Sequence, residues 1–218
     1  AFLICFISGT LGHWSWLLLL LIFVGSSFLA TRFAIVYKMA LGVEESGAGT
    51  RGGPNVVSNG IVPPLVAIGY SLGLLQPEQA LVAFTTSIAA ATSDTMASEI
   101  GVLSPNPVMI TDPRKIVEPG TDGGISLEGT IASLLSSVSM SMLSFAAFLL
   151  VIEQNHPLYS PFEINHLYIS AFFGFFGSII DSFLGATLEN RGILGNSGVN
   201  FCSITLTVLL SLLFLSIS

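Results

Sequence analysis

The chain has 218 residues, of which 52% are hydrophobic and only 9% are charged. With a mean hydropathy of +0.84, this composition predicts a single integral membrane domain over residues 1–218. A formal net charge of −7 and the lack of a basic stripe argue against nucleic acid as a partner. Long runs of Leu, Ile, Phe, Ala and Ser, without the alternation of barrel strands, predict membrane-spanning helices. The fold class we predict is therefore all-α, a polytopic transmembrane helical bundle in a lipid bilayer.

The first third of the chain contains two apolar segments and a polar connection. Residues 1–11 are fewer than the roughly 20 that cross a bilayer, so we predict a partial first span and a missing N-terminal portion. A second span is predicted over 14–31, with tryptophans at its start, where an interfacial aromatic belt lies. The chain then turns polar through Arg32, Lys38 and Arg51.

The middle of the chain combines apolar spans with residues that are costly in lipid. A third span over 55–73 contains Pro63 and Pro64, which remove backbone donors and predict a break near mid-membrane. A fourth span over 78–100 begins apolar but ends in the polar string TSDTMASE, so its last turns cannot face lipid. Broken helices and polar helix ends both predict that this region lines a cavity.

Three further spans follow a polar central loop. They are predicted over 126–152, 167–188 and 199–217, which gives about seven spans with the first one partial. The sixth span carries GFFGSIIDSFLGA, in which glycines three residues apart allow close approach of a neighbouring helix.

The basic residues define one face of the predicted bundle. Alternate threading of the spans places six cations on one side, namely Arg32, Lys38, Arg51, Arg114, Lys115 and Arg191. The positive-inside rule assigns this side to the cytoplasm. The polar segments 51–60, 92–130 and 181–200 open on the same face, which predicts a multi-pass protein whose polar site faces the cytoplasm.

Acidic residues within the spans are the first candidates for a site. Asp94, Ser98 and Glu99 share a helix end, and Asp94 and Glu99 are roughly 140° apart around its axis. The helix must therefore unwind there, or each acid must serve a different partner. Asp181 lies in a similar small-residue setting on the sixth span and could face Asp94. Two such carboxylates suit Mg²⁺, and the alternatives are a helix cap, an interhelical hydrogen bond or a buried polar network.

A glycine-rich loop supplies the second group of candidates. The string GTDGG, with Thr121, Asp122, Gly123 and Gly124, precedes a helix start at Ser126, where backbone amides can bind phosphate. It is no Walker A loop, and a flexible loop is the simpler alternative. Further candidates are cations that could contact phosphates or only set the topology, and amide pairs that could bind a ligand or join helices. They are Arg51, Arg114 and Lys115 and, as amides, Asn55, Asn59, Asn196 and Asn200.

The remaining polar and sulfur-containing residues do not indicate covalent catalysis or a transition-metal site. Cys5 and Cys202 lie in apolar runs and are expected to be buried free thiols. His156 and His166 fall on the far side and are expected at the interface. Carboxylates, cations and backbone amides together indicate a metal-bound polyphosphate.

Five strings resemble one membrane family, which contains plant phytyl-phosphate kinase, an animal transmembrane homologue and many prokaryotic members. They are RGGPNVVSNG at 51–60, ATSDTMASEIG at 91–101, PGTDGGISLEGT at 119–130, DSFLGAT at 181–187 and NSGVNF at 196–201. The DTMAS element is also similar to dolichol kinase and, more distantly, to CDP-diacylglycerol synthase. The resemblance covers most of the chain.

The resemblance implies a polytopic enzyme that transfers the γ-phosphoryl group of CTP to an isoprenoid monophosphate of phytyl, geranylgeranyl or farnesyl type. On this hypothesis Asp94 and Asp181, with Glu99 or Asp122, hold Mg²⁺ on the nucleotide triphosphate, and Lys115 offsets developing charge. The prenyl chain is expected beside the third and sixth spans. A cytidylyltransferase and a cation- or proton-coupled transporter are the alternatives. A homo-oligomer is left open.

Overall fold

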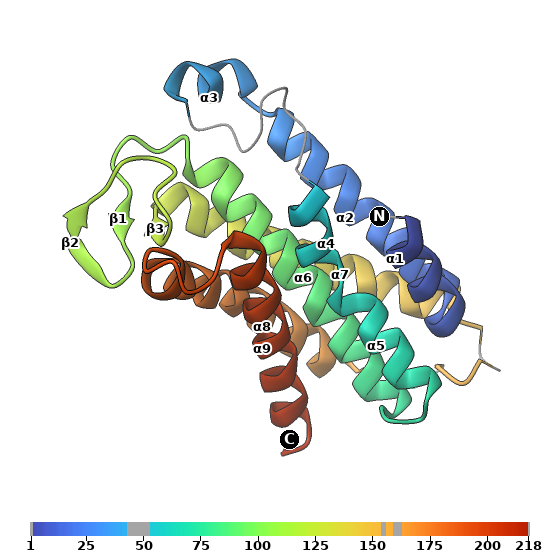
Figure 1. Ribbon diagram of the computed structural model, residues 1–218. Helices are drawn as coiled ribbons and strands as arrows, with labels where there is room; N and C mark the ends of the chain where they lie inside the picture. The colour runs from blue at the N-terminus through green and yellow to red at the C-terminus, as the bar shows by residue number, and fades with distance from the viewer. Residues whose placement is uncertain (1, 43–52, 154–155, 159–162, 218) are drawn as a thin grey trace.

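The computed structural model describes residues 2–42, 53–153, 156–158 and 163–217. Its central element is α6 (Pro77–Gly101), which crosses the middle of the bundle in Figure 1. Every residue from Ala80 to Ser93 is buried, and most of them are small. Small side chains allow the surrounding helices to pack closely on all sides of α6.

In the part of the chain that the structure describes, four helices around α6 are long and apolar enough to cross a membrane. They are α2 (Trp14–Arg32), α7 (Leu127–Val151), α8 (Ile164–Leu184) with its π-helical extension η2 (Gly185–Glu189), and α9 (Asn196–Leu215). The helix α6 has the length but not the hydropathy, because its C-terminal part is rich in polar residues. The predicted all-α membrane bundle is confirmed.

Short helices complete the N-terminal half. An apolar helix, α1 (Phe2–Ile7) with η1 (Ser8–Gly12), is shorter than a full span, as expected of the first segment. After α2, the polar connection contains a helix that was not predicted, α3 (Ile35–Leu41). It begins after Ala34, which has a left-handed backbone with φ of +53°.

The predicted third span is broken into α4 (Gly53–Gly60) and α5 (Val62–Ser71). The break falls at Ile61, so that Pro63 and Pro64 occupy the first turn of α5. Proline is tolerated there because the first backbone N–H groups of a helix have no intrahelical acceptor. The predicted proline break is confirmed.

The two glycines of the sixth span lie where α8 touches α6. A Cβ atom on Gly174 would lie 2.6 Å from Cβ of Ala89, and one on Gly177 would lie 2.8 Å from Cβ of Ala90. No larger residue fits at either position without moving a helix. The glycine-mediated approach predicted from the sequence is therefore present, and it brings Asp181 close to α6.

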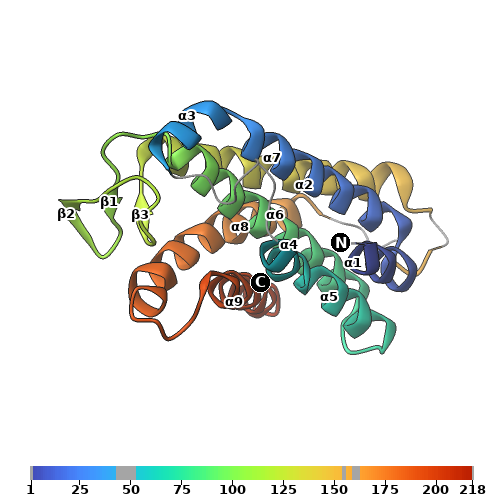
Figure 2. The same ribbon diagram turned by 45° about the horizontal axis from the view of Figure 1, so that its top comes forward.

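The loop predicted after α6 contains a small antiparallel sheet of order β2-β1-β3. Its strands are β1 (Val108–Met109), β2 (Asp112–Ile116) and β3 (Gly124–Ile125), and Val108 pairs with both Ile116 and Ile125. In Figures 1 and 2 the sheet lies at one end of the bundle, beyond the end of α6 and the start of α7.

Candidate functional site

A large cavity opens at the end of the bundle that carries the sheet. Its volume is about 940 Å³, and we call it the polar cleft. The C-terminal half of α6, the loop 118–126, the end of α8 with η2, and the start of α9 supply most of its lining. The polar segments predicted to open on one face therefore do meet at one end of the molecule.

Two acidic side chains from different helices meet in the polar cleft. Asp94 on α6 and Asp181 on α8 both line it, and their carboxyl groups lie within hydrogen-bonding reach of each other. The like charges repel in a partly desolvated site, so the pair is costly without a cation or a shared proton. The expected approach of Asp94 and Asp181 is thus observed.

Amides and hydroxyls from α4 and α9 support this pair. Oγ of Ser203 donates to Oδ1 of Asp181 over 2.8 Å. With the amide of Asn200 oriented to satisfy its neighbours, its nitrogen donates to the same carboxylate over 3.2 Å, and its oxygen accepts from Nδ2 of Asn59 over 3.0 Å. The network links α4, α8 and α9, and it fixes the orientation of the Asp181 carboxylate.

Glu99 serves a different set of partners from Asp94. Its Oε1 accepts from Oγ1 of Thr31 over 2.5 Å, and its Oε2 lies 2.6 Å from Nζ of Lys38. Because α6 continues unbroken to Gly101, the helix does not unwind between the two acids. Both oxygens of Glu99 are engaged, so the geometry favours a role in positioning α6 over the predicted role as a metal ligand.

The GTDGG loop packs against η2. Gly123 has φ of +78°, and a Cβ atom there would lie 2.7 Å from Cα of Ala186. The N–H of Gly124 donates to the carbonyl of Thr121 over 2.8 Å and closes a turn. This amide is therefore not available to bind phosphate, although the sequence analysis expected it to be. Nδ2 of Asn190 donates to the carbonyl of Asp122 and ties the loop to the end of η2.

Glu189 is a cleft residue that sequence reasoning missed. It lines the cleft at the end of η2 and interacts electrostatically with Asp94, Asp122 and the backbone of Asn196 at the start of α9. The available sequence signal was its place within the polar segment 181–200 that was predicted to open on this face.

Asp122 and Ser126 form the rim next to the sheet. Asp122 is exposed, and partial removal of water raises the pKa of its carboxyl above the ordinary value. Ser126 caps α7 by accepting from the N–H of Gly129 over 3.1 Å. The remaining predicted residues that line the cleft are Ser98, Thr121, Gly123, Gly124, Asn59, Asn196 and Asn200.

The two predicted cations that the structure describes, Arg114 and Lys115, do not line the cleft. Arg114 and Lys115 lie on β2 with exposed side chains, and neither lines the cavity. Arg51 falls outside the described residues. Asn55 does not line the cavity either, although its carbonyl accepts from Nδ2 of Asn59 over 3.1 Å. Among the described residues, the lining contains no lysine or arginine.

The acid pair suits a hard divalent cation. In the described part of the chain, no group of three or more acidic, histidine or cysteine side chains is arranged to hold a metal ion. Magnesium does not need one, because it is commonly held by one or two carboxylates, with water and phosphate oxygens completing six ligands. Asp94 and Asp181 therefore fit Mg²⁺ that arrives with an anionic ligand.

Comparison with known proteins places the chain among membrane proteins. Residues 1–208 match the family described as integral membrane protein DUF92. An uncharacterized membrane protein of Methanocaldococcus jannaschii is 34% identical over 185 residues, which cover 85% of this chain and 70% of that protein. Protein PGR of Arabidopsis thaliana is 32% identical over 247 residues, with coverage of 96% and 84%. The chloroplastic protein VTE6 of the same plant is 35% identical over 111 residues, with coverage of 50% and 33%. No solved structure matches.

Proposed function

Because the chain belongs to the DUF92 family of integral membrane proteins, we propose that it is a CTP-dependent prenyl-phosphate kinase. The substrates are CTP and an isoprenoid monophosphate, and the products are CDP and the isoprenoid diphosphate. The resemblance of the five sequence strings to a family with a phytyl-phosphate kinase supports this class of activity. The 35% identity to chloroplastic VTE6 over half of the chain agrees with it.

The observation that carries the proposal is the contact between Asp94 and Asp181 inside a large cleft. Among the described residues, no lysine or arginine lines this cleft. Because acidic side chains line the cleft, a polyanion such as CTP binds there only together with a cation. Mg²⁺ held by the two carboxylates would neutralise phosphate charge and polarise the γ-phosphoryl group. Ser203 and Asn200 keep the Asp181 carboxylate turned toward the cleft.

The proposed reaction needs little covalent chemistry from the protein. An oxygen of the acceptor phosphate attacks the γ-phosphorus of CTP, and the bond between the γ-phosphorus and the bridging oxygen breaks, with its electrons leaving on CDP. The acceptor is a phosphate monoester that is already largely ionised at neutral pH, so no general base is required. The protein chiefly positions two anions and offsets their repulsion.

The location of the cleft supports an enzyme more than a transporter. Its lining comes from one end of the bundle, whereas a transport site is expected near the midplane with a path to both sides. We assign this end to the cytoplasm because Arg32, Arg114, Lys115 and Arg191 lie on segments at the same end. Nucleotide would then reach the cleft from water and the acceptor from the bilayer.

A product assay tests the proposal. Purified protein in detergent receives Mg²⁺, CTP labelled at the γ-phosphate, and farnesyl, geranylgeranyl or phytyl monophosphate. The proposal predicts label in the isoprenoid diphosphate and unlabelled CDP. Labelled pyrophosphate would instead identify a cytidylyltransferase. No turnover by folded protein, together with nucleotide-independent transport in sealed vesicles, would overturn the kinase in favour of a transporter.

A further inference from the structure

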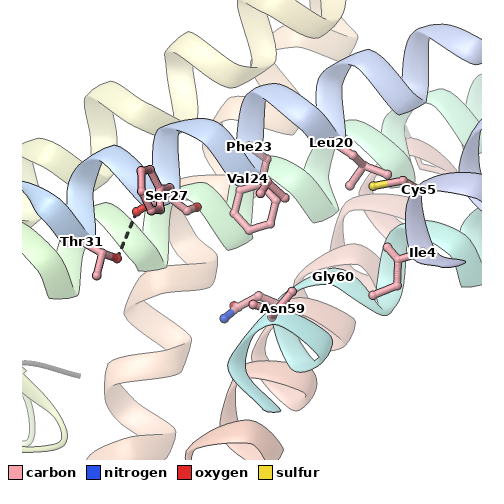
Figure 3. Close-up of a pocket in the computed structure, with 11 residues that line it drawn as sticks. Ile4, Cys5, Leu20, Phe23, Val24, Ser27, Thr31, Asn59 and Gly60 are labelled. Atoms are coloured by element: carbon pink, nitrogen blue, oxygen red, sulfur yellow. Dashed lines mark hydrogen bonds between the residues drawn. The ribbon is translucent and has the colours of Figure 1, made fainter. Parts of the chain in front are cut away.

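A second, apolar cavity of about 190 Å³ lies between α1, α2 and α4, and we call it the apolar groove. Figure 3 shows Leu20, Phe23 and Val24 of α2 along one side, with Gly60 of α4 and Ile4 of α1 across from them. None of its lining residues comes from α8. Its walls are therefore built from the N-terminal helices and the first half of the broken span.

The groove changes from apolar to polar along its length. In Figure 3, Leu20 and Cys5 lie toward one end, Ser27 and Thr31 lie toward the other, and Asn59 lies between them, across from Phe23 and Val24. Oγ of Ser27 and Oδ1 of Asn59 are buried without a hydrogen-bond partner among the described residues. Buried polar atoms without partners are costly, so this end is suited to a ligand that carries a polar group. The Ser27 hydroxyl can donate to an anionic head group, whereas Oδ1 of Asn59 only accepts and can pair only with a donor.

The polar end of the groove borders the polar cleft. Asn59, which is 2% exposed, lines both cavities. Thr31 lines the groove, and its hydroxyl donates to Glu99, which lines the cleft. A molecule with an anionic head in the cleft could therefore extend an apolar chain directly into the groove.

The groove is also open toward lipid. Val24 and Phe28 line it, and 39% and 48% of their surfaces are exposed, so this wall of the groove is not covered by another helix. From Leu20 to Thr31, α2 rises about 16 Å at roughly 1.5 Å per residue. This length is about half of the ~30 Å hydrocarbon core, so a membrane-dissolved chain could enter sideways without leaving the apolar layer.

We propose that the apolar groove holds the isoprenoid chain of the acceptor, with its phosphate beside Asn59 in the polar cleft. This inference rests on the proposed kinase function and adds the binding site of the lipid. The proposed position keeps the expected neighbourhood of the third span and departs from the expected neighbourhood of the sixth, because no residue of α8 lines the groove. Groove length then selects among acceptors of different chain length.

The first test compares a groove variant with a matched control on the same helix. Val24→Trp fills the groove, whereas Leu21→Trp adds the same ring at an exposed position outside its lining. We expect Val24→Trp to lower the ratio of kcat/KM for geranylgeranyl to that for dimethylallyl monophosphate about tenfold, the effect of losing roughly two buried methylene groups. Leu21→Trp should keep the wild-type ratio. An unchanged ratio in Val24→Trp would overturn the groove assignment.

A second test uses the unaltered protein and does not require turnover. Geranylgeranyl monophosphate with a diazirine at the far end of its chain is photo-crosslinked, and peptides are mapped with and without excess unlabelled competitor. Competed labelling within 2–7, 14–32 and 53–60 would support the groove, whereas competed labelling confined to α7, α8 or α9 would overturn it. Labelling in the groove by a protein that makes no diphosphate would refute the kinase alone. Turnover with labelling elsewhere would refute the groove alone.

Discussion

Nζ of Lys38 lies 2.6 Å from Oε2 of Glu99, and both side chains are buried, with exposed fractions of 1% and 7%. The pair joins α3 to α6 one turn beyond Asp94, and Lys38 also donates to the carbonyl of Ala30 over 3.1 Å. The position of the segment that carries Asp94 therefore depends on a helix that the sequence did not predict.

Removing one partner of this pair should destabilise the protein. Lys38→Met leaves the Glu99 carboxylate buried without its cation, so we expect a loss of about 3–5 kcal/mol in the free energy of unfolding, measured by SDS titration in mixed micelles. The double variant Lys38→Met/Glu99→Gln removes both charges and should recover most of the loss. Equal stability of the wild-type protein and the single variant would contradict a buried ion pair.

Substitution of Gly123 should disturb the contact between the glycine loop and η2. Gly123→Ala places a Cβ atom 2.7 Å from Cα of Ala186 in a residue with positive φ, so both strain and a clash result. Gly192→Ala is the matched control, because Gly192 has φ of +69° and open space around its Cβ position. The melting temperature should fall further in Gly123→Ala, and an equal fall in both variants would exclude the packing role.

Asn200 should act as a positioning residue for Asp181. Asn200→Ala removes the donor to Asp181 and the acceptor for Asn59, so we expect the Mg²⁺ concentration for half-maximal activity to rise about 10- to 100-fold. Phe201→Leu, at the next position and exposed, should leave the Mg²⁺ requirement unchanged. A lower kcat at the wild-type Mg²⁺ requirement would argue against this role.

Arg114 and Lys115 were expected from the sequence to contact phosphates, but the structure places them outside the cleft, and their substitution tests which view is right. Because both are exposed on β2 and outside the cleft, the double variant Arg114→Ala/Lys115→Ala should change kcat/KM by less than about threefold at physiological salt, where exposed charges are screened. A loss of a hundredfold would mean that the sheet moves over the cleft when CTP binds. Steady-state kinetics at two salt concentrations separates these outcomes.

Polar residues within apolar spans were the informative part of the sequence. Because polar groups are costly in a membrane, Asp94 and Asp181 were expected to face each other, and Asn59 and Asn200 to bind a ligand or join helices. The structure brings these residues into contact or into one hydrogen-bonded network. The proline break and the glycine approach followed from equally local rules of backbone geometry.

Which residues contact each other across distant segments could not be predicted from the sequence in the same way. Lys38 was interpreted only as a topology charge, because nothing in the sequence places α3 against the end of α6. Glu189 follows an apolar run and precedes Asn190 and Arg191, so it resembled a solvated turn. The strands β1 and β3 contain two residues each, too few for any periodic pattern. These features depend on contacts between distant segments.

The central claim is that Asp94 and Asp181 together hold the cation that binds the CTP phosphates. The most direct measurement is the turnover of Asp94→Asn and Asp181→Asn under saturating Mg²⁺, with the melting temperature recorded in EDTA. Each variant should lose at least about 10²-fold in kcat, because a group that stabilises the transition state is removed. Each should also melt no lower than the wild-type protein, since a repulsion is relieved. Near wild-type turnover by folded Asp94→Asn protein would contradict the claim.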